Sequence, residues 1–460
     1  MTDQAISDTA PGRNRVLGVS TFSFTLLFAV WLMFGVLGIP IQKELGLSDA
    51  QLAWVSAVAI LNGSLWRLAL GVLTDRIGGR SVTVVLLAAT AVPTFLLAHL
   101  DLDYGLLLLL AFLVGFAGNH FSVGIAWNSA WFPRGRQGFA LGLFGAGNVG
   151  ASATKFIGPP LIAATAGGTY LAGLAPGGWR FVPATYAILL AATAIAVAVL
   201  APRHDRRPGR GRPLLAMLRP LRYLRVWRFS LNYVVVFGAY VALAAWLPKY
   251  YVDIYGLDLT HAALLTALFI FPASLLRPLG GWLSDRIGAR RLMYATFGLM
   301  LVTLLLLAAP FGHIVLVTEN GTREVLPYHL GVGVFTALLF LVGVAMGIGK
   351  AAVYKHIPEY FPDDVGAVGG LVGMLGALGG FMLPPLFVAV RGWTGLPQST
   401  FLVLFLLTLT AAAWMHLTVL RLLNQASPGM RRRFDHAPPA HLPAAPITEP
   451  ATPTSAGVAR

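Results

Sequence analysis

Two stretches of this chain match each other, Ser64-Leu-Trp-Arg67-Leu-Ala-Leu-Gly71-Val-Leu-Thr-Asp75-Arg76-Ile-Gly78-Gly-Arg80 and Ser274-Leu-Leu-Arg277-Pro-Leu-Gly-Gly281-Trp-Leu-Ser-Asp285-Arg286-Ile-Gly288-Ala-Arg290. A constant offset of 210 residues aligns their Ser, Arg, Gly and Asp positions. Arg67 and Arg277 both lie inside hydrophobic sequence, where a charged side chain costs several kcal/mol. Two such arginines at equivalent places predict a site on an internal two-fold axis, and their charge predicts an anion in it.

Composition identifies a protein with many membrane-spanning helices. The chain has 460 residues, of which 57% are hydrophobic and 11% are charged, against roughly 25% charged in a typical soluble domain. It has no cysteine, which excludes disulfides and thiolate chemistry. The net charge of +15 does not indicate nucleic acid, because the basic residues fall mostly in loops on one side. Met1 to Arg15 is polar and precedes a full-length apolar span, which predicts a retained first helix rather than a cleaved signal peptide.

Hydropathy predicts twelve spans, since each crossing needs about 20 mostly apolar residues. The predicted spans are 17–39, 51–74, 81–100, 104–131, 138–165, 179–201, 228–251, 261–284, 291–311, 329–356, 364–390 and 398–422.

The loops predict the orientation, because Lys and Arg accumulate in cytoplasmic loops. One side carries Arg13, Arg15, Arg76, Arg80, Arg134, Arg136, Arg286, Arg290, Arg291 and Arg431 to Arg433, together with eight arginines between 202 and 225. The other side carries Lys43, Lys249, Arg323 and Arg391. Both termini are therefore predicted to be cytoplasmic.

The chain is predicted to consist of two six-helix halves. The expected parts are a cytoplasmic N-terminus (1–16), an N-terminal half (17–201), a basic linker (202–227), a C-terminal half (228–422) and a disordered cytoplasmic tail (423–460). A second internal match, at an offset of 229, aligns Gly147 with Gly376. This offset is larger than 210 because the external loop 312–328 lengthens the second half. Parallel repeats around an axis along the membrane normal are typical of one large transporter architecture.

The repeated loop resembles the signature loop of the major facilitator superfamily, and it implies that fold. Its glycines are expected to allow close helix contact, and its Asp to lie near a neighbouring helix N-terminus. A gating role is implied for Gly71, Asp75, Arg76, Gly78, Arg80, Gly281, Asp285, Arg286, Gly288 and Arg290. Their arginines could instead serve only to fix topology.

Arg67 and Arg277 precede the motif aspartates by eight residues, which places them about 12 Å inward along a helix. The planar guanidinium offers a fork of donors that suits a flat oxyanion. Structural ion pairs are the competing interpretation, but no Asp or Glu lies in the middle of any span. The predicted helix 5 is glycine-rich and contains Asn148; its glycines can serve tight packing alone, whereas the Asn148 amide could donate to an anion.

The whole set of spans resembles the NarK-type nitrate/nitrite porter family. The resemblance rests on Gly147-Asn148-Val-Gly150 in helix 5, on the run ending Gly379-Gly380-Phe381 in helix 11, and on one Arg in each of helices 2 and 8. It implies that substrate lies between the two arginines, with Asn148 and aromatic residues of helices 4 and 7 completing the site. The implied substrate-binding residues are Arg67, Arg277, Asn148, Tyr233, Phe121, Phe237, Gly147 and Gly376.

Further cations within the spans point to proton coupling. The segment Gly347-Ile-Gly349-Lys350-Ala-Ala-Val-Tyr354-Lys355-His356 resembles the nitrate–proton symport branch of that family. Arg cannot release a proton, whereas a buried Lys or His can, so the candidates are Lys350, Lys155 and His120. Lys355 and His356 could simply reach toward the cytoplasm.

The sequence thus predicts a secondary transporter of the bacterial inner membrane that moves nitrate, or also nitrite, by alternating access, with proton symport as its coupling. It is expected to work as a monomer in the lipid bilayer, without a metal, cofactor or nucleic acid. Nitrate/nitrite exchange, export and the carriage of another small anion remain alternatives. A membrane sensor would need an output domain, and a membrane enzyme would need clustered His, Asp or Glu; the sequence provides neither.

Overall fold

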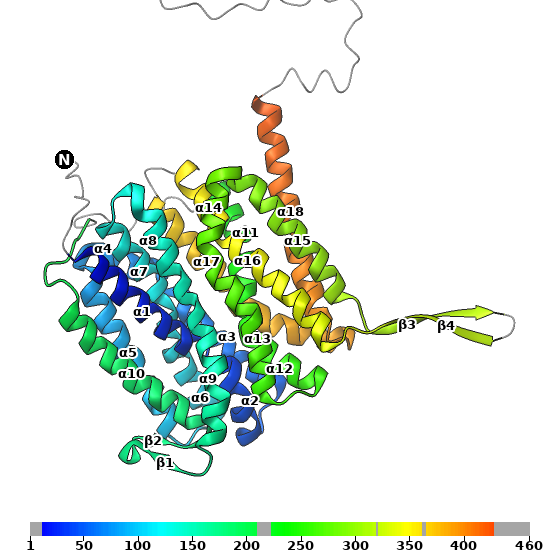
Figure 1. Cartoon of the computed structure of the whole chain (residues 1–460), viewed down its shortest axis with the longest axis horizontal. Helices are drawn as coiled ribbons and strands as arrows, with labels where there is room; N and C mark the ends of the chain where they lie inside the picture. Colours follow the sequence, from blue (N-terminus) through cyan, green and yellow to red (C-terminus); the bar gives the residue numbers. More distant parts are fainter. Residues whose placement is uncertain (1–11, 209–221, 319–320, 361–364, 427–460) are drawn as a thin grey trace, which may run out of the picture. The chain divides into compact units, whose positions relative to one another are not determined.

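The computed structural model describes residues 12–208, 222–318, 321–360 and 365–426 of the chain, and it is helical throughout its spans (Figure 1). Residues 1–412 form one compact unit and residues 413–460 a second. Ten helical stretches of the described residues are long and apolar enough to cross a membrane, and the bent pair Leu259–Leu275 and Arg277–Ile287 makes an eleventh. The remaining predicted span, 138–165, is also helical, from Arg134 to Ala164 in three pieces.

The N-terminal half is composed of these elements: α1 (Arg13–Trp31), α2 (Phe34–Leu45), α3 (Asp49–Leu65), α4 (Arg67–Ile77), α5 (Gly79–His99), α6 (Tyr104–Gly115), η1 (Phe116–Asn119), α7 (His120–Trp131), α8 (Arg134–Ala146), η2 (Gly147–Val149), α9 (Gly150–Ala164), β1 (Thr169–Tyr170), η3 (Leu171–Gly173), β2 (Ala175–Pro176), η4 (Gly178–Arg180) and α10 (Phe181–Leu200). Strands β1 and β2 form a short antiparallel pair.

The C-terminal half has these elements: α11 (Leu224–Tyr233), η6 (Val234–Gly238), α12 (Ala239–Tyr255), α13 (Leu259–Leu275), α14 (Arg277–Ile287), α15 (Ala289–Ala308), β3 (Gly312–Thr318), β4 (Gly321–Tyr328), α16 (Val332–Tyr360), α17 (Val365–Thr394) and α18 (Ser399–Ala426). The loop predicted at 312–328 is an antiparallel hairpin, β3–β4, which the sequence analysis did not anticipate. Helix α11 begins within the stretch predicted as a linker.

The 210-residue repeat is visible in the backbone. Helix α3 ends before Trp66 and α13 before Leu276, and Arg67 and Arg277 are the first residues of α4 and α14. Both helices are 11 residues long and end at Ile77 and Ile287. The residues that follow, Gly78 and Gly288, have φ angles of 96° and 87°, which glycine adopts most readily. The matching sequence therefore predicts matching breaks in the two halves.

Side-chain caps begin the helices on one side of the bundle. The Ser48 hydroxyl accepts from the Gln51 backbone N–H at 3.2 Å, and the Gln51 side chain accepts from Ser48 N at 2.8 Å, which completes a capping box at α3. At the equivalent place before α13, Asp258 accepts from Thr260 N at 2.8 Å. Helices α4 and α14 end at the other side of the bundle, which we call the basic side. The side on which α3 and α13 begin is called the opposite side.

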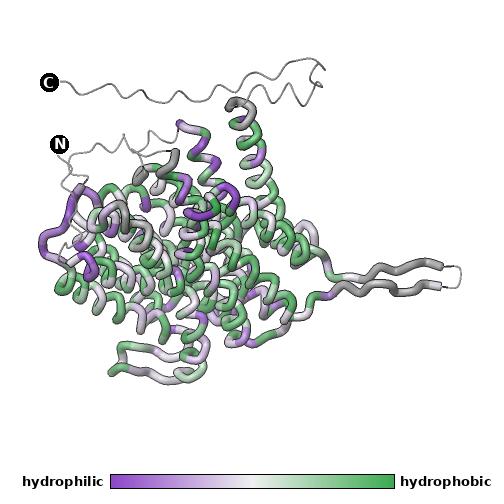
Figure 2. The backbone as a smooth tube through the Cα atoms, turned by 45° about the horizontal axis from the view of Figure 1, so that its top comes forward, coloured by the Kyte–Doolittle hydropathy of each residue, from purple (hydrophilic) through white to green (hydrophobic). Residues whose placement is uncertain are grey.

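The outer faces of the helices are apolar. On the 20-residue helix α10, Val199 is 74% exposed and Ile195 is 67% exposed. Figure 2 shows long hydrophobic stretches along the helices, with hydrophilic stretches gathered near loops and helix ends. Exposed apolar side chains over a helix of this length are what contact with lipid requires.

Close helix contacts depend on glycine at particular places. A Cβ at Gly150 would lie 1.9 Å from the backbone oxygen of Thr25 on α1, so α9 can approach α1 only because residue 150 lacks a side chain. At Gly158, eight residues further along α9, an added Cβ would have its nearest neighbour at 3.7 Å.

We expect Gly150→Ala to destabilise the purified protein by about 1–3 kcal/mol, the usual cost of overpacking. Gly158→Ala is the matched control and should leave the unfolding midpoint in detergent unchanged. Equal midpoints for the two variants in thermal unfolding would contradict the close α1–α9 contact.

Candidate functional site

The two repeated arginines lie at the centre of the site, and both are buried. Arg67 is fully buried, and Arg277 is 6% exposed. Each begins a new helix directly after a break.

Arg67 is held by carbonyl groups from both halves. Its Nε donates to Gly63 O at 2.9 Å and its Nη2 to Gly118 O at 3.2 Å, both within the N-terminal half. Its Nη1 donates to Gly373 O of α17, in the C-terminal half, at 3.3 Å. Three donors that diverge from one planar group make these contacts, a geometry that a single ammonium cannot reproduce.

Arg277 reaches the same place from the other half. Its guanidinium carbon lies 5.2 Å from the Phe121 ring centroid, and that of Arg67 lies 5.3 Å from the same ring. One phenyl ring on α7 thus contacts both cations, and cation–π attraction offsets part of the cost of burying them. Arg277 Nη1 has no hydrogen-bond partner among the described residues, so it is available to an acceptor.

Aromatic side chains enclose the pair. The Phe237 centroid lies 5.2 Å from the Arg67 guanidinium carbon, and Phe237 stacks on Tyr233 with the ring centroids 4.9 Å apart. Tyr233 in turn lies against Gly376, where an added Cβ would be 2.3 Å from a Tyr233 ring carbon. The structure therefore brings Phe121, Tyr233 and Phe237 together with the arginines, and Gly376 makes room for Tyr233.

Tyr354 is a member of this group that the sequence analysis did not assign to the site. Its ring lies 5.6 Å from the Arg277 guanidinium carbon and 5.1 Å from the Tyr233 ring. Its hydroxyl donates to Gly369 O of α17 at 3.0 Å. Tyr354 is four residues after Lys350 and so shares its helix face, a spacing that could have identified it.

Asn148 lies beside the aromatic group and has free hydrogen-bonding capacity. The Tyr240 hydroxyl donates to the Asn148 backbone oxygen at 3.5 Å, and the Tyr240 ring lies 6.2 Å from that of Phe237. Both side-chain polar atoms of Asn148 are buried without a partner among the described residues. At Gly147, an added Cβ would be 2.7 Å from Phe24 of α1, so a side chain at this position would meet α1; a place for Gly147 at the anion stays a prediction.

The three candidate proton carriers occupy different places. Lys350 is fully buried and lies beside the site; its Nζ donates to Ala273 O at 3.0 Å and lies 3.2 Å from the Tyr240 ring centroid. His120 is buried against α5, with Nε2 3.2 Å from Thr83 Oγ1. Lys155 is fully buried on α9, and its Nζ has no partner in the described structure.

The repeated loops behave differently in the two halves. In the first, the linker residue Asp205 accepts from the Arg80 backbone N–H at 2.8 Å and from the Trp127 and Trp131 indoles at 3.0 and 2.8 Å. In the second, Asp285 forms an ion pair with Lys355 of α16. The sequence analysis missed Asp205, which is an isolated acid in a basic stretch.

The motif glycines also differ from expectation. A Cβ at Gly71 would meet its nearest neighbour at 3.7 Å, and one at Gly281 would meet nothing within 4 Å. Neither glycine is therefore required for close helix contact in this conformation. Of the remaining motif residues, Asp75 and Arg76 engage other residues, and Arg286 lies over the Trp282 ring at 4.2 Å.

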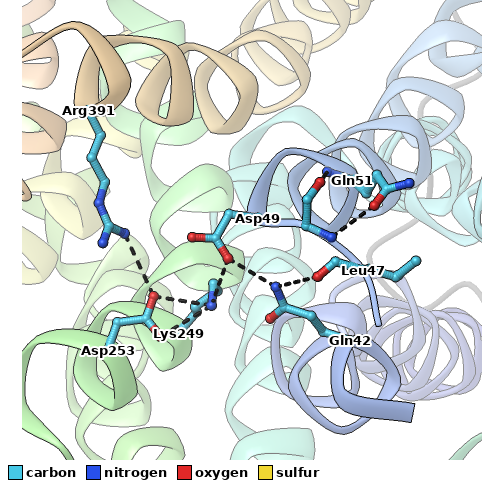
Figure 3. Close-up of polar contacts among 8 residues, drawn as sticks. Gln42, Leu47, Asp49, Gln51, Lys249, Asp253 and Arg391 are labelled. Atoms are coloured by element: carbon cyan, nitrogen blue, oxygen red, sulfur yellow. Dashed lines mark hydrogen bonds and ion pairs between the residues drawn. The ribbon is translucent and has the colours of Figure 1, made fainter. Parts of the chain in front are cut away.

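A network of ion pairs joins the two halves on the opposite side (Figure 3). Lys249 Nζ of α12 lies 3.1 Å from Asp49 Oδ1 of α3 and 3.1 Å from Asp253 Oδ2. Arg391 Nη1 of α17 lies 3.7 Å from Asp253 Oδ2. Gln42 of α2 adds a hydrogen bond to Asp49 at 3.0 Å. A further pair on this side, Arg180 with Glu44 at 2.9 Å, involves a basic residue that the loop count did not include.

Among the residues that the structure describes, no group of three His, Cys, Asp or Glu side chains lies close enough together to hold a metal ion. The site instead offers guanidinium, ammonium, amide and phenol groups around a buried centre. Groups of this kind are able to bind and orient an anion.

Comparison with known proteins shows the family of this chain. Residues 19–314 and 257–453 match the profile of the family described as Major Facilitator Superfamily. This chain belongs to the major facilitator superfamily. The fold of this major facilitator protein is also similar to that of a bacterial homologue of the human lysosomal transporter Spinster, in an inward-facing and occupied conformation, with a TM-score of 0.64 at 15% identity, over 89% of this chain and 97% of that one.

Relatives within the superfamily are NarK-type porters, as the sequence motifs indicated. The chain is 67% identical to a probable nitrate/nitrite antiporter of Thermus thermophilus, over 92% of this chain and 96% of that protein. It is 32% identical to a probable nitrate/nitrite transporter of Mycobacterium tuberculosis strain H37Rv (87% and 94% covered) and 30% identical to a nitrite extrusion protein of Bacillus subtilis (82% and 88% covered). This major facilitator protein is therefore a multi-pass membrane transporter and not an enzyme.

Proposed function

We propose that this protein moves nitrate, and also nitrite, across the bacterial inner membrane by alternating access. The observation that carries the proposal is the convergence of Arg67 and Arg277, one from each half, on the Phe121 ring. Nitrate is a planar oxyanion whose oxygens suit the donors of a guanidinium fork. The aromatic enclosure leaves little room, which favours a small anion over a bulky organic one.

Binding would act on the equilibrium between the two facing states. A ligand shifts such an equilibrium only by binding one state more tightly than the other. Two guanidiniums in one buried site repel each other, and an anion between them removes that repulsion. We expect the halves to close most readily around bound anion, which makes closure depend on substrate.

The basic side is proposed to be cytoplasmic, with both termini on it, because arginine-rich short loops remain on that side of a membrane. The opposite side, with the ion-pair network of Asp49, Lys249, Asp253 and Arg391, is then periplasmic. The protein is proposed to work as a monomer surrounded by lipid, because the two halves of one chain supply the two arginines of the site.

Proton symport is the proposed coupling, with Lys350 as the carrier. Lys350 adjoins the site and hydrogen-bonds to a carbonyl rather than a carboxylate, so its charge is not fixed by an ion pair. Nitrate/nitrite exchange is the second candidate, and the name of the Thermus thermophilus relative, a probable nitrate/nitrite antiporter, favours it. Exchange would need no titrating group in the site.

Transport into proteoliposomes tests the function and separates the two couplings. The purified protein should take up nitrate into vesicles that are acidic outside and contain no anion substrate, if it is a symporter. Uptake that occurs only when nitrite is present inside would establish exchange instead. Failure to move either anion under both conditions would refute the proposed function.

Asn148→Ala should weaken nitrate binding by about 1–2 kcal/mol, the range for a hydrogen bond to a charged partner. The reason is that the Asn148 amide has no competing partner in the described structure and is free to donate to an anion. Titration calorimetry on the purified variant and its parent measures the change, with the exposed Asn14→Ala as control. An unchanged dissociation constant would assign Asn148 to packing.

A further inference from the structure

Helix α9 carries a line of buried polar groups that have no partners. The Lys155 ammonium and the Ser152 hydroxyl are both without a hydrogen bond in the described structure, as is the Asn148 amide just before the helix. These residues are exposed by 0%, 1% and 0% respectively. Spacings of four and three residues place all three on one face of the helix.

The neighbouring polar residue on the other face is fully satisfied. The Thr154 hydroxyl donates to Ala29 O at 3.1 Å and lies 2.7 Å from the Tyr186 hydroxyl. The missing partners are therefore a property of the Asn148–Ser152–Lys155 face and not of α9 as a whole.

An unpaired ammonium in this position is costly. Removing a charge from water costs several kcal/mol unless an opposite charge or hydrogen bonds compensate. No Asp or Glu occurs in α1, α9 or α13, and α9 packs against α1 in its own half and α13 in the other. The protein itself thus offers Lys155 no counter-charge on these helices, whereas a mobile anion would supply one.

The line leads away from the arginines toward the opposite side. Lys155 is seven residues beyond Asn148, about 10 Å along the helix axis, and α9 continues to Ala164 on that side. Helix α9 adjoins α13 of the other half, so α9 lies at the boundary between the two halves.

We propose that Lys155 and Ser152 form a second binding position for the transported small oxyanion, between the arginine pair and the opposite side. The anion pairs with the Lys155 ammonium and accepts from the Ser152 hydroxyl, then moves on to Asn148 and the two arginines. This inference rests on the proposed function, since it takes the substrate to be an inorganic anion. It gives Lys155 a role in conduction, distinct from that of a proton carrier.

Nitrate uptake by proteoliposomes, measured against external nitrate concentration, tests the proposal. Lys155→Met should raise KM about tenfold, because the passing anion loses a charged partner, and Ser152→Ala should raise it less. Lys155→Arg should raise KM less than Lys155→Met does, since arginine keeps the positive charge. Thr154→Val on the satisfied face is the matched control, and its KM should remain that of the parent.

Three results would overturn the proposal. A parental KM in Lys155→Met would make the ammonium irrelevant to the anion path. Loss of pH-driven uptake in Lys155→Arg equal to that in Lys155→Met would identify Lys155 as a proton carrier, because arginine cannot release a proton. If Lys155→Met fails to fold, equal KM values for Ser152→Ala and Thr154→Val would be decisive. A parent protein that transports no nitrate would instead refute the proposed function itself.

Discussion

Replacing Arg67 or Arg277 by lysine is expected to abolish nitrate transport while the protein still folds and inserts. Lysine keeps the charge but loses the planar fork. Arg67 uses three nitrogens to reach Gly63, Gly118 and Gly373, and an ammonium cannot hold these contacts and the anion together. Uptake of nitrate into proteoliposomes, normalised to the amount of inserted protein, measures the effect.

Arg180→Lys is the matched control for this pair. Arg180 forms an ion pair with Glu44 outside the site, so its replacement by lysine should leave the uptake rate at the parental level. Parental rates in either Arg67→Lys or Arg277→Lys would show that the fork is not required, and the arginines would have to be removed from the proposed site.

Lys350→Met is expected to abolish uptake driven by a pH gradient and to spare nitrate–nitrite exchange. Lys350 adjoins the site, and a bound anion would favour its protonated form, which the departure of the anion would then disfavour. The coupled proton would travel inward with each nitrate on this group. Vesicles with an imposed pH gradient, and vesicles preloaded with nitrite, give the two rates to compare.

Lys43→Met, a change at an exposed residue on α2, controls for loss of a lysine in general. Accumulation of nitrate by Lys350→Met against its gradient, with only a proton gradient supplied, would rule out Lys350 as the carrier. Exchange without symport in the parent would leave the antiporter as the function, and Lys350 would then have no titration to perform.

The sequence predicted the fold because the fold repeats. A motif that recurs after 210 residues fixed the relation between the halves, and the breaks before Arg67 and Arg277 appear at equivalent places in the structure. Span positions followed from hydropathy, since a bilayer imposes a length on every crossing. Helix ends were less certain: α11 begins at Leu224, because a basic residue at a helix end does not stop the helix.

The composition of the site was harder to predict than its centre. Sequence gives the depth of a residue along a helix but not the direction it faces, so it could not show that a side chain at position 147 would point at Phe24. Contacts such as that of Arg67 with Gly373, 306 residues away, depend on how two halves dock. Asp205 was recognised only when the linker and the first half were brought together, through its contacts with Arg80, Trp127 and Trp131.

The contacts of Arg67 and Arg277 are reciprocal, and this has a pharmacological consequence. Arg67 of the first half donates a hydrogen bond to Gly373 O of the second, and the Arg277 guanidinium of the second half contacts the Phe121 ring of the first. A small anion can lie against both guanidiniums while the contacts of Arg67 with Gly373 and of Arg277 with Phe121 are kept. A larger oxyanion bound to one guanidinium would keep the other half at a distance and so prevent the halves from closing. Such compounds should act as competitive inhibitors that are not transported.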